Sequence, residues 1–371
     1  MADRLFVHTD EKDEKKGYEI ILEKDFSGLE GAVKELGYEK RRMCIVTDSN
    51  VSDLYASEVE RELKSIALTV TVFVFEAGEE NKNLDTVRKL YTHLIENRFD
   101  RKDVLIALGG GVVGDLTGFA AATFLRGIDF IQLPTTLLSC TDSSIGGKTG
   151  VDLDSYKNMV GAFYMPRLVY MNLSALESLS ARQFASGMAE VIKHGLIRDE
   201  SYYEYIVNNF NEINDREVDV LKKVIKRSLE IKRDVVEKDP TEQGERALLN
   251  FGHTIGHAIE KYSDFKLTHG ECVALGSIAA CYISYKRQQL STEEFYEIRD
   301  MYLPFFLPIS LNDDADADEI LKLTKSDKKM QGNRLKFILL KKPGKAVIDT
   351  TVTDEEILDA IKQLIITDEF D

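Results

Sequence analysis

Five short runs rich in β-branched and aromatic residues, each separated from the next by enough chain for a helix, occupy the first half of the sequence. Strands joined by about ten or more residues pair in parallel through helical crossovers, and this alternation is typical of βαβ units. The runs cover residues 43–47, 70–75, 104–108, 130–134 and 168–171. We therefore predict an α/β domain with a parallel sheet in this half of the chain.

The second half of the chain is predicted to be mostly helical. From Leu176 onward the β-branched runs thin out, and residues 215–238 repeat Val, Leu and Ile at spacings of three and four, which indicates an amphipathic helix. One late run, residues 335–340, could form a strand. The 371 residues suffice for two domains. We place the boundary near Ser180, giving domains at 1–180 and 181–371, and expect the active site in the cleft between them.

Net charge limits the partners of the chain. With 64 acidic against 48 basic residues, the formal net charge is −16, whereas affinity for nucleic acid or anionic membranes comes from clustered Lys and Arg. We therefore expect neither nucleic acid nor membrane as a partner. An anionic substrate would need a local cationic pocket.

The cysteines and the hydropathy of the chain point to a cytoplasmic protein. Cys44, Cys140, Cys272 and Cys281 are scattered without CxxC spacing, which indicates reduced thiols rather than a disulfide or zinc framework. The first sixteen residues lack an apolar signal core, and no run of about 18 apolar residues occurs. We expect the protein to be soluble and located in the cytoplasm.

Residues 108–119, LGGGVVGDLTGF, directly follow a predicted strand. Closely spaced glycines let backbone N–H groups approach a phosphate, and the next helix presents its positive N-terminus, so this segment could cradle a pyrophosphate. It lacks GxGxxG spacing, and a tight turn between strand and helix is the alternative. Asp48, just past the run 43–47, could bind a ribose hydroxyl or cap the next helix.

Hydroxyls, glycines and cations are concentrated in residues 134–152, PTTLLSCTDSSIGGKTGVD, and in YKNMVGAF at 156–163. The side chains there that are able to contact a polyol phosphate are Asp142, Lys148, Lys157 and Asn158. The GGK sequence is similar to phosphate-binding loops, although the Walker spacing GxxxxGK[ST] is absent. The density of small residues between two apolar runs favours a binding function.

Three histidines fall within residues 250–271, and a carboxylate lies in the earlier motif GMAEVIKHG at 187–195. Glu190, His253 and His269 together form a candidate site for one divalent metal ion. One carboxylate and two imidazoles leave a coordination position open, as a catalytic zinc site requires and a structural site lacks.

Two further side chains accompany this candidate metal site. Lys193 stands three residues after Glu190 and so shares its helix face. His253 and His257 have the spacing of the HExxH zinc proteases, but the residues between them include no glutamate, which excludes that interpretation. His257 is then either a residue that supports the metal ligands or an acid–base residue.

Seven motifs, in order between residues 109 and 276, resemble those of the dehydroquinate synthases, which are sugar phosphate cyclases related to the iron-containing polyol dehydrogenases. The similarity spans residues 48 to about 329. The motifs are GGGVVGD, PTTLL, DSSIGGKTGVD, KNMVGAF, GMAEVIKHG, NFGHTIGHA and HGECVALG. The resemblance implies an N-terminal Rossmann-like α/β domain and a C-terminal mostly helical metal-binding domain. It also implies NAD, one zinc or cobalt ion and a homodimer.

Matched position by position, the resemblance assigns the metal ligands to Glu190, His253 and His269. The substrate positions are occupied by Asp142, Lys148, Lys193, Lys232, Arg246, Asn250 and His257. Asn158 and Lys329 match two further phosphate contacts, with Lys328 competing for the second, and Arg126 matches an arginine lent across the dimer interface. The nucleotide positions are occupied by Asp48, Glu79, Lys82, Gly111, Gly114, Asp115, Thr135, Thr136, Lys148, Lys157 and Ser178. Ser178 stands where the family more often has Thr, and Cys140 and Pro240 also depart slightly from its pattern.

The resemblance further implies a reaction. The family converts 3-deoxy-D-arabino-heptulosonate 7-phosphate (DAHP) to 3-dehydroquinate in the shikimate pathway, by transient oxidation with NAD, phosphate elimination, re-reduction, ring opening and aldol closure. The alternatives are a cyclase of the 2-deoxy-scyllo-inosose or valiolone type, a polyol dehydrogenase, and an inactive binding protein. Arg246, Asn158 and His257 favour dehydroquinate synthase, since the other cyclases would not need a carboxylate clamp.

Overall fold

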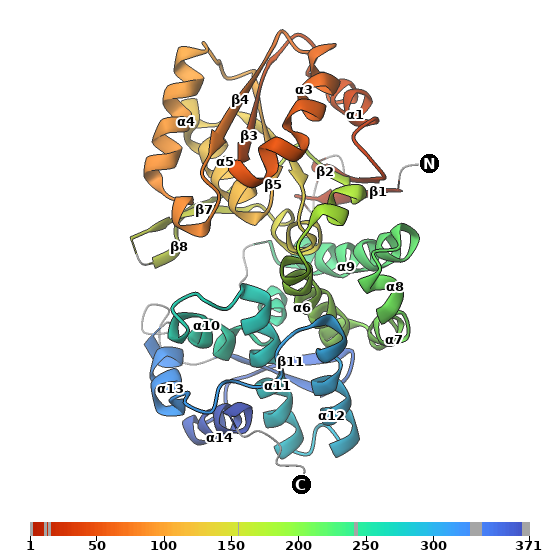
Figure 1. Cartoon of the computed structure of the whole chain (residues 1–371), viewed down its shortest axis with the longest axis vertical. Helices are drawn as coiled ribbons and strands as arrows, with labels where there is room; N and C mark the ends of the chain where they lie inside the picture. The colour runs from red at the N-terminus through yellow and green to blue at the C-terminus, as the bar shows by residue number, and fades with distance from the viewer. Residues whose placement is uncertain are drawn as a thin grey trace. The chain divides into compact units, whose positions relative to one another are not determined.

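The computed structural model describes residues 3–10, 13, 16–154, 156–240, 244–326 and 336–365. The chain folds into two compact units, which we call unit 1 (Met1–Leu179) and unit 2 (Ser180–Asp371). Figure 1 shows the helices and strands of both units. None of the described helices combines the length and apolar composition needed to cross a bilayer.

Unit 1 is built on a seven-stranded sheet with the order β1-β2-β9-β6-β5-β3-β4. The β1–β2 pair is antiparallel and the other pairs are parallel. The strands are β1 (Asp3–His8), β2 (Gly17–Glu23), β3 (Arg42–Asp48), β4 (Thr69–Phe75), β5 (Val104–Gly109), β6 (Asp129–Pro134) and β9 (Leu168–Asn172). The five predicted runs are confirmed as β3, β4, β5, β6 and β9, and their ends differ from the prediction by at most one residue.

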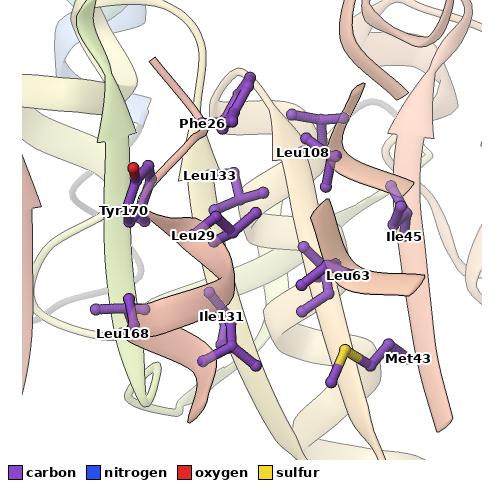
Figure 2. Close-up of a cluster of buried hydrophobic side chains, with 14 of the residues drawn as sticks. Phe26, Leu29, Met43, Ile45, Leu63, Leu108, Ile131, Leu133, Leu168 and Tyr170 are labelled. Atoms are coloured by element: carbon purple, nitrogen blue, oxygen red, sulfur yellow. The ribbon is translucent and has the colours of Figure 1, made fainter. Parts of the chain in front are cut away.

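Helices cover both faces of this sheet. Successive residues of β3 point to opposite faces, so Met43 and Ile45 pack in one apolar cluster while Cys44 and Val46 pack in the other. Figure 2 shows the first cluster, in which Leu29 of α1 and Leu63 of α3 lie against the sheet. Each such leucine stabilises the fold by about 1.5 to 3 kcal/mol. The covering helices are α1 (Leu29–Glu35) and α3 (Ser57–Lys64) on this face, and α4 (Leu84–Glu96) and α5 (Gly111–Thr123) on the other.

Two hairpins in unit 1 were not predicted from the sequence. β1 and β2 mix charged with apolar residues, in DRLFVH and GYEIILE, and so lack the nearly continuous apolar character of strands such as β5. β7 (Lys148–Leu153) and β8 (Tyr156–Phe163) form a separate antiparallel sheet from the segment rich in glycine and hydroxyls. Three short helical segments lie earlier in the sequence than this hairpin. They are η2 (Glu79–Asn81), η3 (Phe124–Arg126) and η4 (Ser139–Ser143).

Unit 2 is mostly helical around a central helix, α11. Helix α11 is apolar on all sides and packs against α6, α10, α12, α14 and β10, as expected for a helix surrounded by others. The helices are α6 (Ala181–Arg198), α7 (Glu200–Asn208), α8 (Phe210–Asn214), α9 (Val218–Lys238), η6 (Glu245–Asn250), α10 (His253–Tyr262), α11 (His269–Lys286), α12 (Thr292–Asp300), η7 (Leu303–Phe305), α13 (Ala317–Ser326) and α14 (Asp354–Ile365).

The predictions for this half are largely confirmed. Helix α9 corresponds to the amphipathic stretch 215–238, and β10 (Phe337–Lys342) corresponds to the late strand, whose first predicted residue lies outside the described residues. β10 pairs with β11 (Lys345–Asp349) in a small antiparallel sheet. The predicted fold class, a parallel α/β half followed by a mostly helical half, is therefore correct.

Candidate functional site

Glu190 lies in the buried middle of α6. Its side chain is completely buried, and so is that of Lys193 one turn later, whose ammonium forms an ion pair with Glu190 Oε2. A buried carboxylate costs several kcal/mol unless a partner compensates its charge. The spacing of three residues on one helix supplies that partner within the same element.

His253 and His269 are the first residues of α10 and α11. Gly252 adopts the left-handed conformation (φ 78°) that turns the chain into α10. Thr268 caps α11 through a reciprocal capping box with Glu271. Both imidazoles therefore stand at defined helix starts.

The three predicted metal ligands of unit 2 converge. Glu190 Oε1 lies 3.5 Å from His253 Nε2 and 3.3 Å from His269 Nε2, and the three donor atoms lie within 4.8 Å of one another. Ligands about 2.0 to 2.1 Å from a tetrahedral zinc ion are separated by about 3.4 Å. One oxygen and two nitrogens at this spacing fit a divalent metal such as zinc or cobalt.

The protonation of these groups follows from their surroundings. Burial alone would raise the pKa of Glu190, but Lys193 and the two histidines lower it well below its usual range. Burial and the charge of Lys193 lower the pKa of His253. Burial would lower the pKa of His269 as well, yet Glu190 and Glu260 outweigh it and raise that pKa to about 9. Without metal, the His269 imidazolium thus provides positive charge beside Glu190.

The backbone fixes one of the two imidazoles in a ligating orientation. His253 Nδ1 lies 3.0 Å from the carbonyl oxygen of Phe251, to which its N–H donates. Nε2 is then left with its lone pair directed toward Glu190. Metal-binding histidines commonly donate their second ring N–H in this way.

Helices α6 and α11 are clasped together beside the candidate metal site. Arg182 binds Glu271 bidentately, with Nε–Oε1 2.9 Å and Nη2–Oε2 2.7 Å. One turn later, Ser186 Oγ accepts a hydrogen bond from the backbone N–H of Gly270 at 3.0 Å. A further turn along α6 comes Glu190, beside His269. Three successive turns of one helix therefore hold the start of the other.

The other predicted substrate residues of unit 2 lie on three different elements, α9, η6 and α10. Lys232 on α9 and Arg246 in η6 are buried, with exposed fractions of 5% and 2%, and Arg246 Nη1 donates to the carbonyl of Pro240 at 2.7 Å. Asn250 is exposed at the end of η6. His257 is half-buried, and its ring centroid lies 5.1 Å from that of His253. Lys328 and Lys329 lie outside the described residues.

Several predicted nucleotide residues of unit 1 meet at one edge of the sheet. Strands β6, β5 and β3 are neighbours, so their carboxyl ends lie side by side, where ligands of parallel α/β sheets bind. Asp48 ends β3 and caps the next turn by accepting from the N–H groups of Asn50 and Val51, and burial raises its pKa. The other residues at this edge are Gly111, Gly114 and Asp115 of α5 and Thr135 and Thr136 after β6.

Lys82 is a buried cation among acids. Its Nζ lies 2.7 Å from Glu79, 3.7 Å from Asp115 and 3.8 Å from Asp152, and donates to Asn158 Oδ1 at 2.8 Å. Burial would lower the pKa of Lys82, but the three carboxylates raise it. The structure therefore joins three predicted nucleotide contacts to one predicted phosphate contact.

The remaining predicted residues of unit 1 lie on separate elements. Lys148 is exposed at the start of β7, Lys157 is half-buried in β8, and Asp142 lies in η4. Arg126 is exposed in a left-handed turn with φ 69°. Ser178 Oγ is hydrogen-bonded to the hydroxyl of Tyr55 at 2.7 Å.

The residues that hold the predicted metal ligands in place were not predicted from the sequence. Arg182, Ser186 and Gly270 form the clasp between α6 and α11, and Glu260 faces His269. A signal for Glu260 was present, since it stands seven residues after His253 and three after His257 and so shares their helix face. The clasp depends on a crossing of two helices that spacing along one helix does not reveal.

Comparisons with known proteins identify the family. Residues 72–186 match the family model described as 3-dehydroquinate synthase N-terminal, and residues 187–330 match the one described as 3-dehydroquinate synthase C-terminal. The chain is 44% identical over 343 residues to the 3-dehydroquinate synthase of Acetivibrio thermocellus, covering 92% of this chain and 95% of that protein. It is 40% identical to that of Thermoanaerobacter pseudethanolicus, covering 96% of this chain and 99% of that protein.

A solved structure agrees with this family at the level of the fold. A 2-deoxy-scyllo-inosose synthase complexed with carbaglucose-6-phosphate, NAD+ and Co2+ superposes with a TM-score of 0.87 at 26% identity, covering 97% of this chain and 100% of that one. Its sequence identity is well below that of the dehydroquinate synthases. The chain belongs to the 3-dehydroquinate synthase family.

Proposed function

We propose that the chain is a 3-dehydroquinate synthase, a carbon–oxygen lyase that converts DAHP to 3-dehydroquinate and phosphate. The observation that carries the proposal is the convergence of the Glu190, His253 and His269 donor atoms, in a chain that belongs to the matching family.

NAD and one divalent metal ion, zinc or cobalt, are the proposed cofactors. The glycine-rich turn between β5 and α5 and the Glu/His/His donor set support them, as does the related inosose synthase that binds NAD+ and Co2+. Bound at these positions, the metal would act as a Lewis acid toward substrate hydroxyls while NAD would take up a hydride and return it.

Buried cations of unit 2 are proposed to bind the acidic end of the substrate. We assign Arg246 and Lys232 to the substrate carboxylate, because a guanidinium binds a carboxylate bidentately and both cations are already desolvated. Lys193 stabilises the oxygen of the transient ketone. These charges supply the local cationic environment that an acidic protein needs for an anionic substrate.

The phosphate group is assigned to a second set of donors. Charge that grows on the leaving oxygen is stabilised by fixed cations and amides, and the departing phosphate assists removal of the neighbouring proton. Asp142 accepts hydrogen bonds from substrate hydroxyls. The phosphate donors are Arg126, Lys148, Asn158, Asn250 and Lys329.

His257 is proposed to move a proton during ring opening. It is half-buried and lies beside both His253 and His269, with ring centroids 5.1 Å and 6.0 Å away. An imidazole is the side chain best suited to acid–base work near neutral pH. The opened product then closes as a carbocycle in an aldol step.

The nucleotide site and the assembly complete the proposal. We assign NAD to Asp48, Glu79, Lys82, Gly111, Gly114, Asp115, Thr135, Thr136, Lys148, Lys157 and Ser178. We further propose a NAD-binding domain at residues 1–180, a metal- and substrate-binding domain at 181–371, and a homodimer. Four free and buried cysteines support a reducing, cytoplasmic location.

One assay separates this function from its alternatives. Purified protein is incubated with DAHP, substoichiometric NAD and zinc, while phosphate, NADH and dehydroquinate are followed. A synthase releases phosphate and forms dehydroquinate over many turnovers without accumulating NADH. Net NADH would instead indicate a dehydrogenase, and turnover of glucose 6-phosphate without turnover of DAHP would place the chain with the inosose synthases.

A further inference from the structure

The two imidazoles of the candidate metal site differ in how their second nitrogen is held. His253 Nδ1 donates to a backbone carbonyl, that of Phe251, at 3.0 Å. His269 Nδ1 instead faces a carboxylate, Glu260 Oε2, at 3.9 Å. Glu260 is buried, with an exposed fraction of 7%, so its charge is stable only beside hydrogen-bond donors or cations.

Helix packing dictates that Glu260 stands opposite His269. A Cβ on Gly276 would collide with the carbonyl oxygen of Gly252. A Cβ on Gly256 would lie only 2.7 Å from the carbonyl oxygen of Cys272. Helices α10 and α11 therefore run in close contact, with 252 opposite 276 and 256 opposite 272. Four residues further along α10 is Glu260, and four residues back along α11 is Thr268. Glu260 therefore lies opposite Thr268, the residue before His269.

We propose that Glu260 is a positioning residue, which accepts a hydrogen bond from His269 Nδ1–H and thereby directs the His269 Nε2 lone pair at the metal. The inference rests on the proposed function, because it assumes that metal binds Glu190, His253 and His269. Carboxylates that orient a metal-binding histidine also make it a stronger ligand. Closing the 3.9 Å separation to a hydrogen bond requires a shift of about 1 Å.

A second metal ion is the competing use of the same groups. His257, Glu260 and His269 also have ligand atoms within 4.8 Å of one another. That site would require His269 to bind metal through both nitrogens, and a neutral imidazole has one lone pair only. The orienting role requires only the neutral imidazole, with a proton on Nδ1 and the lone pair on Nε2, and is therefore favoured.

The test compares variants of the full chain by zinc affinity, measured by competition with a chromogenic chelator. Glu260→Ala should weaken binding about 10- to 100-fold, and Glu260→Gln, which keeps the shape and an acceptor oxygen but loses the charge, should weaken it less. Glu293→Gln, a change of the same chemistry on the exposed surface of α12, should have no effect. Thermal unfolding of the metal-free proteins reports whether each variant is folded.

A spectroscopic measurement keeps the test decisive if Glu260→Ala does not fold. In 15N-histidine-labelled zinc protein, His269 Nδ1 should carry a proton in the wild type, and its resonances should shift in Glu260→Gln. Zinc affinity within twofold of wild type in Glu260→Ala or Glu260→Gln, with an unchanged His269 signal, would overturn the inference. Two zinc equivalents in the wild type, one of them lost with Glu260, would overturn it in favour of the second metal site.

The failure of the proposed metal site would look different. In that case the wild type would bind no zinc, or His253→Ala would bind zinc with wild-type affinity. Either result would refute both the proposed metal site and the role of Glu260. If the wild type binds zinc and His253→Ala does not, a result against Glu260 concerns Glu260 alone.

Discussion

A single glycine decides how closely the His269 helix approaches the Glu190 helix. A Cβ on Gly270 would overlap the backbone of Ser186, including its carbonyl oxygen, and the same pair is joined by a hydrogen bond. Because backbone atoms cannot rotate away, a larger residue must push α6 and α11 apart. The distance between the two proposed metal ligands Glu190 and His269 is thus set by a residue that is not itself a proposed ligand.

We therefore expect Gly270→Ala to weaken zinc binding at least tenfold and to destabilise unit 2 by about 1 to 3 kcal/mol, the usual cost of overpacking. Chelator competition and urea denaturation measure the two effects. Gly31→Ala is the matched control, since nothing lies within 4 Å of its added Cβ, and it should leave both unchanged or raise stability slightly. Wild-type zinc affinity in Gly270→Ala would contradict the clasp.

A substitution of Arg246 tests the proposal that this residue binds the substrate carboxylate. Arg246→Ala should keep zinc but weaken DAHP binding by about 2 to 4 kcal/mol, because a desolvated charge pair is broken, which corresponds to roughly 30- to 900-fold in KM. Steady-state kinetics with a metal assay measure both. Arg233→Ala removes an arginine of α9 that pairs with Asp234 at 2.7 Å, and should change KM little. An unchanged KM in Arg246→Ala would refute the assignment.

At the level of secondary-structure elements, an ion-pair network attaches helix α14 to the end of the central helix α11. Arg287, just after α11, binds Glu356 of α14 through Nε–Oε1 2.6 Å and Nη2–Oε2 2.7 Å, and binds Asp349 of β11 at 3.1 Å. The hydrogen bond from Arg287 lowers the pKa of Glu356 to about 2. A carboxyl whose pKa is depressed in the folded state adds stability above its unfolded pKa and loses it as the pH falls.

The stability difference between wild type and Glu356→Gln should therefore be largest at neutral pH, about 1 kcal/mol for a partly exposed pair. It should shrink as the pH falls from about 4.5 toward 2. Urea denaturation at pH 7, 4 and 3 provides the comparison. Glu355→Gln, an exposed neighbour, should differ little from wild type at every pH, and a difference for Glu356→Gln that grows in acid would be inconsistent with the pairing.

The strands and the candidate metal site also show which features could be predicted from the sequence. The inner strands β3, β5 and β6 were predictable because burial on both faces favours nearly continuous apolar runs. The edge strand β1 and the β7–β8 hairpin escaped because one-sided burial admits charged and small residues. The convergence of Glu190, His253 and His269 could be predicted from residue type and spacing. The sequence places Glu260 on the helix face of His253 and His257. Its position opposite His269, like that of Gly270 against Ser186, is decided by which turns of separate helices meet.

For the whole molecule, we expect metal binding to be linked to proton release and to stability. Without metal, the pKa of His269 is raised to about 9, so at neutral pH a proton must leave before Nε2 can bind metal. Raising the pH removes this competition. We expect apparent zinc affinity to increase by up to about tenfold per pH unit between pH 7 and 9 and then to level off.

Calorimetric titration with zinc in buffers of different ionisation enthalpy counts the protons released. About one proton at pH 7, falling toward none above pH 9, is the expected result, and an affinity that falls as pH rises would exclude the assignment of His269. Zinc at 100 times its Kd should also stabilise the fold by about 2.7 kcal/mol, and a chelator should remove that gain.

The most direct test of the proposed metal site, on which the other proposals depend, is anomalous diffraction at the zinc edge from crystals grown with zinc. We expect one strong peak about 2.0 to 2.1 Å from a carboxylate oxygen of Glu190 and from Nε2 of His253 and His269. A peak elsewhere, or those three side chains turned away from one another in the zinc-bound crystal, would contradict it.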